Sequence, residues 1–381
     1  MQTSRGRFLT THTGSLPRPD DLVQMMFARE EGRSPDPAAL QTRIRTAVSE
    51  IVRKQVDAGI DVVSDGEAGK PSYATYVKDR LTGFGGESVP VTSYQDVMEF
   101  PSLAKRVFGD PGRARRKTPG CNGPLGVRDP DAAVTDVSNF RAALEASPAV
   151  EGFMSAASPG VISLFFGNSH YPDHRSYLFA IADAMRYEYE TVAKAGFILQ
   201  IDCPDLAMGR HIQFAGLGLA EFRKMAALHV EALNRALANV PPDQSRIHLC
   251  WGNYEGPHHY DVALRDILDV AFRARPNGIS FEAANPRHAH EWQVFRDTRL
   301  PEGKLLIPGV IESKTNYIEH PELVAERIGR FAELVGRENV IAGVDCGFGT
   351  WVGQAAVDPG VVWKKLESLS EGARIASAGF W

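Results

Sequence analysis

A histidine and a cysteine lie two residues apart in the apolar run "IHLCWGN" at residues 247–253. Residues i and i+2 of a β-strand point to the same face, so His248 and Cys250 can reach one ligand together. Imidazole nitrogen and thiolate sulfur are good ligands for Zn²⁺, with bonds of about 2.0–2.1 Å and about 2.3 Å. The alternative is a buried thiol that packs beside a core histidine, and these two residues alone do not decide between the interpretations.

Two further residues can complete a four-ligand site. Glu282 ends the run "GISFE" (278–282), and Cys346 ends the apolar part of "NVIAGVDCG" (339–347). A set with one histidine and two cysteines favours zinc over magnesium or calcium, because thiolate is a soft ligand. We therefore predict a Zn²⁺ site formed by His248, Cys250, Glu282 and Cys346.

A zinc site with two thiolates indicates activation of a thiol. Zinc sites that activate water usually have histidine and carboxylate ligands and an open position. A metal ion deprotonates a coordinated thiol outright, and thiolate is a strong nucleophile at neutral pH. The predicted reaction is attack of a substrate's zinc-bound thiolate on an electrophilic carbon.

Acidic residues at the ends of other apolar runs would surround this metal. Asp65 and Glu67 lie in "GIDVVSDGE" (59–67), and Asp202 lies in "GFILQIDCP" (196–204). Carboxylates there could bind the ammonium group of an amino-acid thiol such as homocysteine. The alternative is that they cap helices or form ion pairs at strand ends. Cys203 is a competing ligand, although a buried structural cysteine is the simpler interpretation.

All these residues belong to eight short apolar runs that have the composition of β-strands, with helical patterns between them. The runs are 7–15, 59–67, 152–160, 196–204, 246–253, 278–285, 304–310 and 339–347, and the clearest helices are 42–59, 175–196, 220–240 and 321–336. Eight strand–helix alternations predict a (β/α)8 TIM barrel, whose working residues lie at the C-terminal ends of the strands. An open doubly wound sheet is the alternative, but no G-x-G-x-x-G follows the first run.

Residues 84–148 interrupt this alternation and are rich in glycine, proline and charge. We predict that they form an insertion after the second strand, an antiparallel flap near the mouth of a single-domain barrel that spans residues 1–381. The basic segment "GRARRKTPG" (112–120) is interpreted as a solvated loop, with an anion site as the alternative.

The composition excludes several classes of protein. The chain has 381 residues, 43% of them hydrophobic, and a formal net charge of -5, which argues against a general nucleic-acid surface. No stretch approaches the roughly 20 apolar residues of a membrane span, and no signal-peptide core is present, so we predict a cytoplasmic protein without a membrane partner. Four cysteines are too few for a disulfide scaffold in so long a chain. An apolar face on 220–240 is compatible with a homodimer.

The chain resembles the catalytic C-terminal domain of cobalamin-independent methionine synthase over nearly its full length. The similar segments are "TGSLPRP" (13–19), "SDGEAGKPSYATYV" (64–77), "LQIDCPDLA" (199–207), "HLC" (248–250), "ISFE" (279–282) and "DCGFGT" (345–350). The resemblance implies that Ser15 contacts the amino-acid carboxylate and that Glu67 and Asp202 hold the amino group. It also implies zinc held by the four ligands named above, and homocysteine as the acceptor.

Some positions depart from the family pattern. Phe166 stands where the family has a tryptophan that stacks on the folate pterin, and Lys314 stands near a family histidine thought to protonate the leaving nitrogen. Cys203 replaces a glutamate, and 381 residues leave no room for the family's second, N-terminal barrel. Six residues are candidates for the donor site: His12, Asp65, Phe166, His258, His259 and Lys314. The family donor is a methylated folate; the identity of the donor here stays open.

The leading prediction is a zinc-dependent methyl or alkyl transfer from a small-molecule donor to a thiol. A related single-barrel group, the epoxyalkane:coenzyme M transferases, has a similar length and a similar H-x-C…C pattern, and a basic residue near the thiol's acidic end would favour that reaction. A metal-free lyase like uroporphyrinogen decarboxylase, a relative in fold, would need arginines that face the mouth. A thiol or metal carrier would bind both ligands without turnover.

Overall fold

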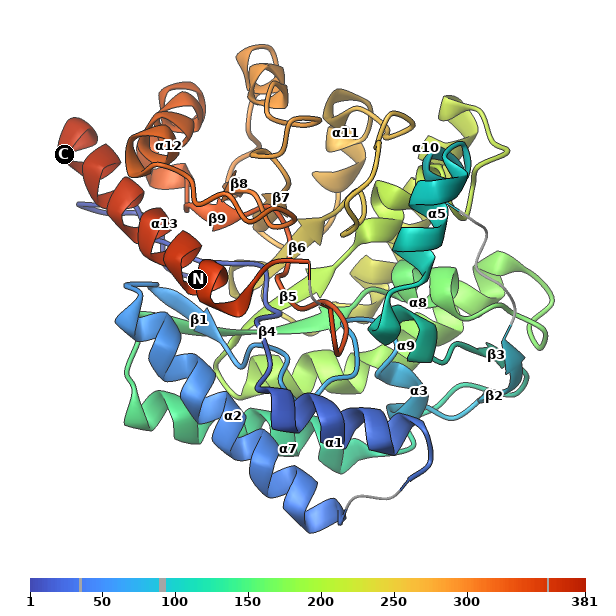
Figure 1. Ribbon diagram of the computed structural model, residues 1–381. Helices are drawn as coiled ribbons and strands as arrows, with labels where there is room; N and C mark the ends of the chain where they lie inside the picture. Colours follow the sequence, from blue (N-terminus) through green and yellow to red (C-terminus); the bar gives the residue numbers. More distant parts are fainter. Residues whose placement is uncertain (34–35, 89–93, 355) are drawn as a thin grey trace.

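The computed structural model describes residues 1–33, 36–88, 94–354 and 356–381, and its centre is a curled parallel sheet of seven strands (Figure 1). The strands, in their spatial order, are β1 (Val62–Ser64), β4 (Glu151–Ala157), β5 (Ile198–Asp202), β6 (Ser245–Leu249), β7 (Gly278–Phe281), β8 (Leu305–Ile311) and β9 (Gly343–Val344). Each strand coincides with one of the predicted apolar runs. The fold is therefore mixed α/β, as predicted, and the sequential strand order differs from that of a doubly wound sheet, which reverses.

The first predicted strand, residues 7–15, is present only as two isolated bridges. Thr10 pairs with Ala342 and Thr11 pairs with Val62, both in parallel orientation. Residues 10–11 thus lie between β9 and β1, the two edges of the sheet. Among the described residues, the parallel sheet has seven strands and residues 10–11 link its two edges, while the complete eight-stranded barrel stays a prediction.

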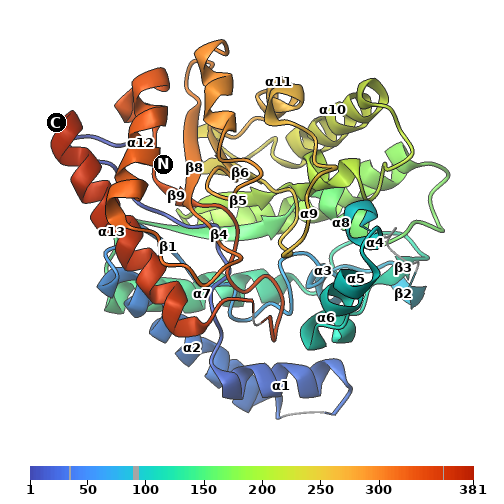
Figure 2. The ribbon, with the colours of Figure 1, turned by 45° about the horizontal axis from the view of Figure 1, so that its top comes forward.

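Helices surround the sheet, as the two views in Figures 1 and 2 show. The longer ones are α1 (Asp20–Glu30), α2 (Pro37–Asp57), α7 (Pro130–Ala146), α9 (His174–Lys194), α10 (Leu219–Ala236), α12 (Pro321–Val335) and α13 (Pro359–Phe380). Shorter ones are α3 (Val77–Arg80), α8 (Pro159–Phe165) and α11 (Leu268–Ala271). The four clearest helical predictions are confirmed as α2, α9, α10 and α12.

Local sequence explains where these helices begin and which face they bury. The Asp36 side chain accepts a hydrogen bond from the backbone N–H of Ala38, and Pro37 occupies the first helical position of α2. Leu40, Ile44 and Ile51 recur at helical spacing and are buried. The stripe they form is buried where α2 packs against β1 and α7.

The predicted insertion contains an antiparallel pair of strands, β2 (Phe84–Ser88) and β3 (Pro119–Cys121). Three short helices, α4 (Gln95–Met98), α5 (Pro101–Phe108) and α6 (Pro111–Arg115), connect them, while residues 89–93 lie outside the described residues. The last part of the predicted insertion is α7, which packs against α2 and α9 in the outer layer. The single-domain organisation stays a prediction.

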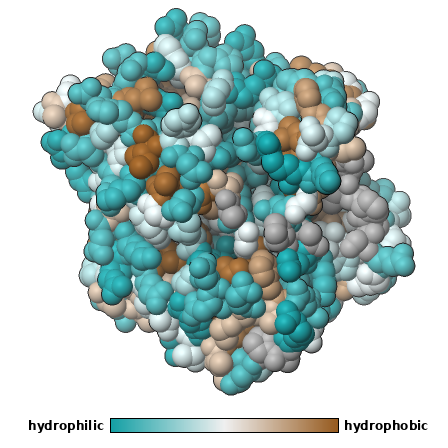
Figure 3. All heavy atoms as spheres, viewed as in Figure 1, coloured by the Kyte–Doolittle hydropathy of each residue, from teal (hydrophilic) through white to brown (hydrophobic). Residues whose placement is uncertain are grey.

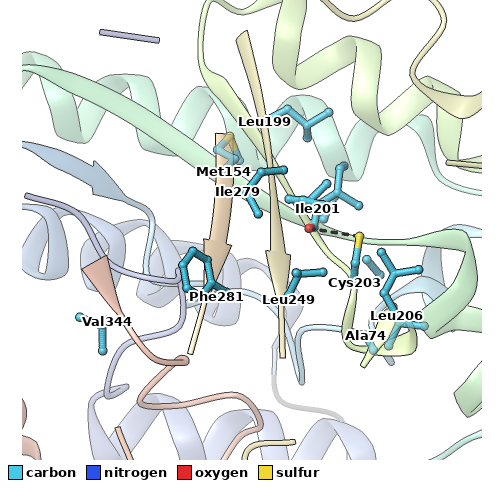
Figure 4. Packing of buried hydrophobic residues seen from close by; sticks show 14 of the residues in the cluster. Ala74, Met154, Leu199, Ile201, Cys203, Leu206, Leu249, Ile279, Phe281 and Val344 are labelled. Carbon is cyan, nitrogen blue, oxygen red and sulfur yellow. Dashed lines mark hydrogen bonds between the residues drawn. The ribbon is translucent and has the colours of Figure 1, made fainter. Parts of the chain in front are cut away.

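Cys203 belongs to the hydrophobic core. Figure 4 shows its side chain beside Leu206 and Ala74, with the thiol donating a hydrogen bond to the carbonyl oxygen of Ile201 at 3.5 Å. Burial raises the pKa of this thiol well above its ordinary value. The structural interpretation of Cys203 fits these surroundings better than a role as a metal ligand.

The surface is mostly hydrophilic on the face drawn in Figure 3, where hydrophobic residues form small separate groups. Within the described ranges, no helix combines the length and the hydropathy needed to cross a bilayer. The apolar side of α10, with Phe222, Val230 and Leu233, is buried, and the helix packs against α8, α9 and α11. This face is therefore used inside the protomer, and the homodimer stays a prediction.

A buried arginine joins the first segment of the chain to the sheet. Arg246, in β6, is 1% exposed. Its guanidinium donates hydrogen bonds to Gln200 Oε1 at 2.9 Å, Thr11 Oγ1 at 3.1 Å and the carbonyl oxygen of His12 at 2.9 Å. It also lies over the Phe153 ring, 3.8 Å from the centroid. One side chain thus connects residues 11–12 with β4, β5 and β6.

Replacing this arginine by Arg246→Met should destabilise the protein by about 3 kcal/mol or more, because three buried acceptors lose their donor. Urea unfolding followed by circular dichroism measures the change. Arg265→Met, at an exposed arginine, is the matched control and should change stability by less than about 0.5 kcal/mol. Equal effects of the two substitutions on stability would contradict the inference that Arg246 connects residues 11–12 with the sheet.

Candidate metal centre and active site

The structure brings three of the four predicted metal ligands together. The ligand atoms of His248, Cys250 and Cys346 all lie within 4.8 Å of one another, and all three residues are buried. The two Sγ atoms are 3.5 Å apart, and two sulfurs bound to one tetrahedral Zn²⁺ lie about 3.8 Å apart. His248 Nε2 is buried without a hydrogen-bond partner. A buried ring nitrogen in that state calls for a ligand, so these three residues fit a zinc ion.

Backbone register and neighbouring polar groups orient the His248 ring and the Cys250 thiol. His248, on β6, is paired with Ser280 on β7. His248 Nδ1 lies 3.3 Å from Ser280 Oγ, which leaves Nε2 to face the two thiols. Cys250 Sγ accepts a hydrogen bond from the backbone N–H of Gly252 at 3.2 Å. Both side chains are therefore held by the strand ends rather than by a mobile loop.

Asp345 fixes the third ligand, Cys346, relative to the chain that follows β7. Its carboxylate accepts hydrogen bonds from the backbone N–H groups of Ala283 and Asn285, each at 2.8 Å. A Cβ at Gly309 would lie 2.2 Å from Asp345 Oδ1, so only glycine leaves room for this carboxylate. The ends of β7 and β9 are joined in this way at the residue that precedes Cys346.

Glu282, the fourth predicted ligand, is engaged by protein donors. Its Oε1 accepts from the backbone N–H of Trp251 at 2.9 Å, and its Oε2 accepts from Asn285 Nδ2 at 2.8 Å and Lys314 Nζ at 2.7 Å. Burial raises the pKa of Glu282, but the charge and hydrogen bond of Lys314 together with the nearby His288 and His258 outweigh it, so the net shift is downward. The carboxylate is outside the group of three convergent ligand atoms, and its place in the metal site stays a prediction.

The three convergent residues open into a cavity whose inner wall carries the predicted substrate residues Ser15, Glu67 and Asp202. The backbone is tight here. A Cβ at Gly14 would lie 2.7 Å from Glu67 Oε1, and a Cβ at Gly347 would lie 1.9 Å from Ser15 Oγ. Glu67 itself has φ 55°, a conformation that side chains other than glycine rarely adopt. The chain accepts this strain where it presents the Glu67 carboxyl to the cavity.

The two acids in the cavity are poised to receive a cation. Burial and, to a lesser extent, the nearby Asp202 charge raise the pKa of Glu67 to about 8. Burial also raises the pKa of Asp202 to about 6. Asp202 Oδ1 accepts from Gln200 Nε2 at 2.8 Å, whereas Glu67 Oε2 is buried without a partner. An ammonium group between the carboxyls would supply the missing donors and favour their ionised forms.

Two donor-site candidates near the N-terminus support the backbone instead of lining the cavity. His12 Nε2 lies 2.6 Å from Gln55 Oε1, and its Nδ1 accepts from the backbone N–H of Gly14 at 3.1 Å. Asp65 accepts from the backbone N–H of Glu67 at 3.0 Å. Both side chains are committed to holding the turns that carry the cavity residues, which explains why they do not face it.

The candidates farther along the chain are also absent from the cavity wall. Phe166 is fully buried and packs on the Phe84 ring, with 4.5 Å between ring centroids, while its neighbour Phe165 lines the cavity. His258 is held between Asp261 at 2.9 Å and the Tyr254 carbonyl. His259 is exposed and pairs with Glu99 at 3.0 Å. Lys314, the sixth, contacts Glu282 as described above.

Sequence reasoning missed the outer wall of the cavity. It is lined by Tyr73, Tyr94, Arg113, Arg116, Phe165 and Trp351, among others. The signal was present in the basic segment 112–120, which we interpreted as a solvated loop. That interpretation holds for Arg115 and Lys117, which are exposed, and is wrong for Arg113 and Arg116, which face the cavity.

Removal of one thiolate tests the metal centre. Cys250→Ser should weaken zinc binding by at least about tenfold, because a hard hydroxyl replaces a soft ligand. Zinc content after dialysis, and the thiolate charge-transfer absorbance of the cobalt-substituted protein, measure the effect. Cys203→Ala, which changes a buried cysteine outside the group, should keep full zinc content. Equal zinc loss in both variants would show that His248, Cys250 and Cys346 are not the zinc site.

The raised pKa of Glu67 predicts a pH-dependent stability. The folded protein holds this proton up to pH about 8, whereas the ordinary value is 4.5, so the folded state binds more protons between these values. The free energy of unfolding should therefore fall as pH rises from about 5 to 8. In Glu67→Gln, which cannot titrate, the fall should be smaller. The free energies of unfolding are measured by urea unfolding at constant zinc. If they change with pH in parallel for the two proteins, the raised pKa of Glu67 is contradicted.

Comparisons with known proteins agree with this geometry. A family model described as "Cobalamin-independent synthase, Catalytic domain" matches residues 8–116. A methionine synthase from Thermococcus kodakarensis is 26% identical over 371 residues, which cover 96% of this chain and 92% of that protein. A 2-hydroxypropyl-CoM lyase from Xanthobacter autotrophicus is 25% identical over 404 residues, which cover 97% of this chain and 95% of that protein.

A solved structure extends the likeness to the fold. The B12-independent methionine synthase from Shewanella sp. W3-18-1, in complex with selenomethionine, superposes with a TM-score of 0.74 at 19% identity, over 98% of each chain. The sequence comparisons and the fold comparison thus point to the same group of proteins, and the chain is similar to the cobalamin-independent methionine synthases.

Proposed function

We propose that the protein is a zinc-dependent enzyme that transfers a methyl or other alkyl group to a thiol, with an amino-thiol such as homocysteine as acceptor. One observation carries the proposal: the unpartnered His248 Nε2 and the two thiols share a cavity with the Glu67 and Asp202 carboxyls. The relative named methionine synthase supports the same reaction. In this proposal residues 7–15 serve as the first strand of a (β/α)8 barrel, and the cavity lies at the C-terminal strand ends.

The chain's own residues would bind and orient the acceptor. His248, Cys250 and Cys346, with Glu282 as the fourth ligand, would hold Zn²⁺, which makes a bound thiol a strong nucleophile. Glu67 and Asp202 would pair with the ammonium group, and Glu67 would release its proton when the cation arrives. Ser15, which lines the same cavity, would donate a hydrogen bond to the carboxylate. Fixing the ammonium end in this way aims the sulfur at the metal ligands.

A second candidate acceptor is a thiol with a sulfonate group, such as coenzyme M. Arg113 and Arg116 line the same cavity, and such basic side chains can hold a sulfonate. The relative named 2-hydroxypropyl-CoM lyase supports this alternative. The arginines would also suit a metal-free lyase, but that reaction gives no use to the group of His248, Cys250 and Cys346.

Calorimetric titration of thiols into the zinc-loaded protein tests the proposal. Homocysteine should bind more tightly than coenzyme M, and Glu67→Gln should weaken homocysteine binding by about tenfold or more, because a charged partner of the ammonium is lost. Glu99→Gln, at an exposed glutamate, is the control and should leave the affinity unchanged. Binding of 2-mercaptoethanol, which has no ammonium group, should be the same in all three proteins.

The outcomes separate the candidate functions. Tighter binding of coenzyme M would favour the sulfonate thiol, and an absence of heat with every thiol would overturn the proposal. Thiol binding without alkylation by 5-methyltetrahydrofolate or by an epoxide would identify a carrier rather than an enzyme.

A further inference from the structure

Two arginines of the insertion reach the cavity without an acidic partner. Arg113 lies on α6 and Arg116 follows it, and both line the cavity. In the part of the chain that the structure describes, neither forms an ion pair with a carboxylate, whereas the exposed Arg115 between them pairs with Glu31 at 2.8 Å. The guanidinium of Arg113 has one hydrogen bond, from Nη1 to the Tyr94 hydroxyl at 3.4 Å, and its Nε is buried without a partner.

Contacts with the rest of the molecule fix α6 in place. Asp110 Oδ1 accepts from the backbone N–H of Arg113 at 2.8 Å and from Trp351 Nε1 at 2.8 Å. A Cβ at Gly112 would lie 2.1 Å from the carbonyl oxygen of Val352, so the helix rests directly on the segment that follows Cys346. The positions of the two arginines are therefore set by the same segment that carries a metal ligand.

Aromatic rings hold the two guanidinium groups. Arg113 stacks on Trp351, 4.5 Å from the ring centroid, and Arg116 stacks on Phe165, at 4.6 Å. Stacking uses the flat face of a guanidinium and leaves its N–H edge available to a carboxylate or sulfonate. Each arginine is thus held beside a ring, and Arg113 Nε in particular is buried and still needs an acceptor.

In the described residues, no carboxylate pairs directly with either Arg113 or Arg116. The pKa of Arg116 is lowered, chiefly by burial, and Arg113 lowers it further through like-charge repulsion. The nearby carboxylate is that of Asp110, which is occupied as the cap of α6 and by Trp351. An anion between the two guanidinium groups would remove the repulsion and satisfy the free N–H groups.

We propose that Arg113 and Arg116 form an oxyanion-binding site at the outer end of the cavity, which binds a carboxylate or sulfonate group of a substrate. The inference rests on the proposed function in one respect: the proposed reaction is the reason why this substrate would also meet the metal ligands. The cavity then has two ends of opposite charge, with Glu67 and Asp202 inside and the two arginines outside. Such an arrangement selects substrates that carry an anionic group far from the reacting sulfur or carbon. The anion belongs either to the thiol or to the alkyl donor.

Two single variants and a matched control test the site. Arg113→Gln and Arg116→Gln remove the charge and keep a polar side chain, while Arg115→Gln changes the exposed arginine between them. Calorimetry of the zinc-loaded proteins would use three anionic probes: coenzyme M, homocysteine, and 5-methyltetrahydrofolate in the presence of a saturating thiol. 2-Mercaptoethanol serves as the uncharged thiol. Thermal unfolding and zinc content show that each variant keeps its fold and its metal.

Arg113→Gln and Arg116→Gln should weaken the binding of at least one anionic probe by about tenfold or more and leave the binding of 2-mercaptoethanol unchanged. Weaker binding of an anionic thiol assigns the oxyanion to the acceptor, and weaker binding of the folate alone assigns it to the donor. Binding of ethanesulfonate that is lost in both variants would support the site even if no thiol binds, which separates this inference from the proposed function. If Arg113→Gln and Arg116→Gln bind every anionic probe as tightly as Arg115→Gln does, the proposed oxyanion site is overturned.

Discussion

Buried polar atoms without a hydrogen-bond partner indicate which chemical groups a ligand of this protein must supply. Four of the ten such side-chain atoms in the described residues line one cavity: Glu67 Oε2, Arg113 Nε, His248 Nε2 and Asn253 Oδ1. Each unsatisfied buried group costs about 1–3 kcal/mol. A fold that concentrates these costs in one place recovers them only when a ligand supplies the missing donors and acceptors. The proposed ligands would meet these needs, with a cation at Glu67, a metal at His248 and an anion at Arg113.

The surrounding structure is rigid enough to keep those atoms apart from one another. Asp345 joins the ends of β7 and β9 through backbone hydrogen bonds, and Arg246 joins residues 11–12 to the sheet. Glycines at positions 14 and 347 let the backbone pass close to Glu67 and Ser15. These contacts hold the backbone of the cavity wall in place while Glu67 Oε2 and His248 Nε2 stay without partners. Preorganisation of this kind is what a site needs to bind and orient a substrate.

Much of the inner site could be predicted from sequence, because strand ends are local signals. Apolar runs placed His248, Cys250 and Cys346 at the ends of parallel strands, and parallel strands bring such ends together. Phe166 and Lys314 were harder to place, because one residue of shift around a short helix exchanges Phe166 for Phe165, and because only the fold shows that Lys314 meets Glu282. The first strand was predicted too long, since only Thr10 and Thr11 form bridges.

The outer wall could not be predicted, because it depends on how an insertion docks rather than on periodicity. Arg113, Arg115 and Arg116 look alike in sequence, yet one pairs with Glu31 at the surface and the other two stack on rings in the cavity. The difference follows from the contact of Gly112 with the chain beyond Cys346, which turns one side of α6 inward. In the proposed function the strand ends would supply the reactive centre, and the insertion would supply charge at the entrance. Selection among thiols and donors would then depend on the insertion, while the metal chemistry depends on the strand ends.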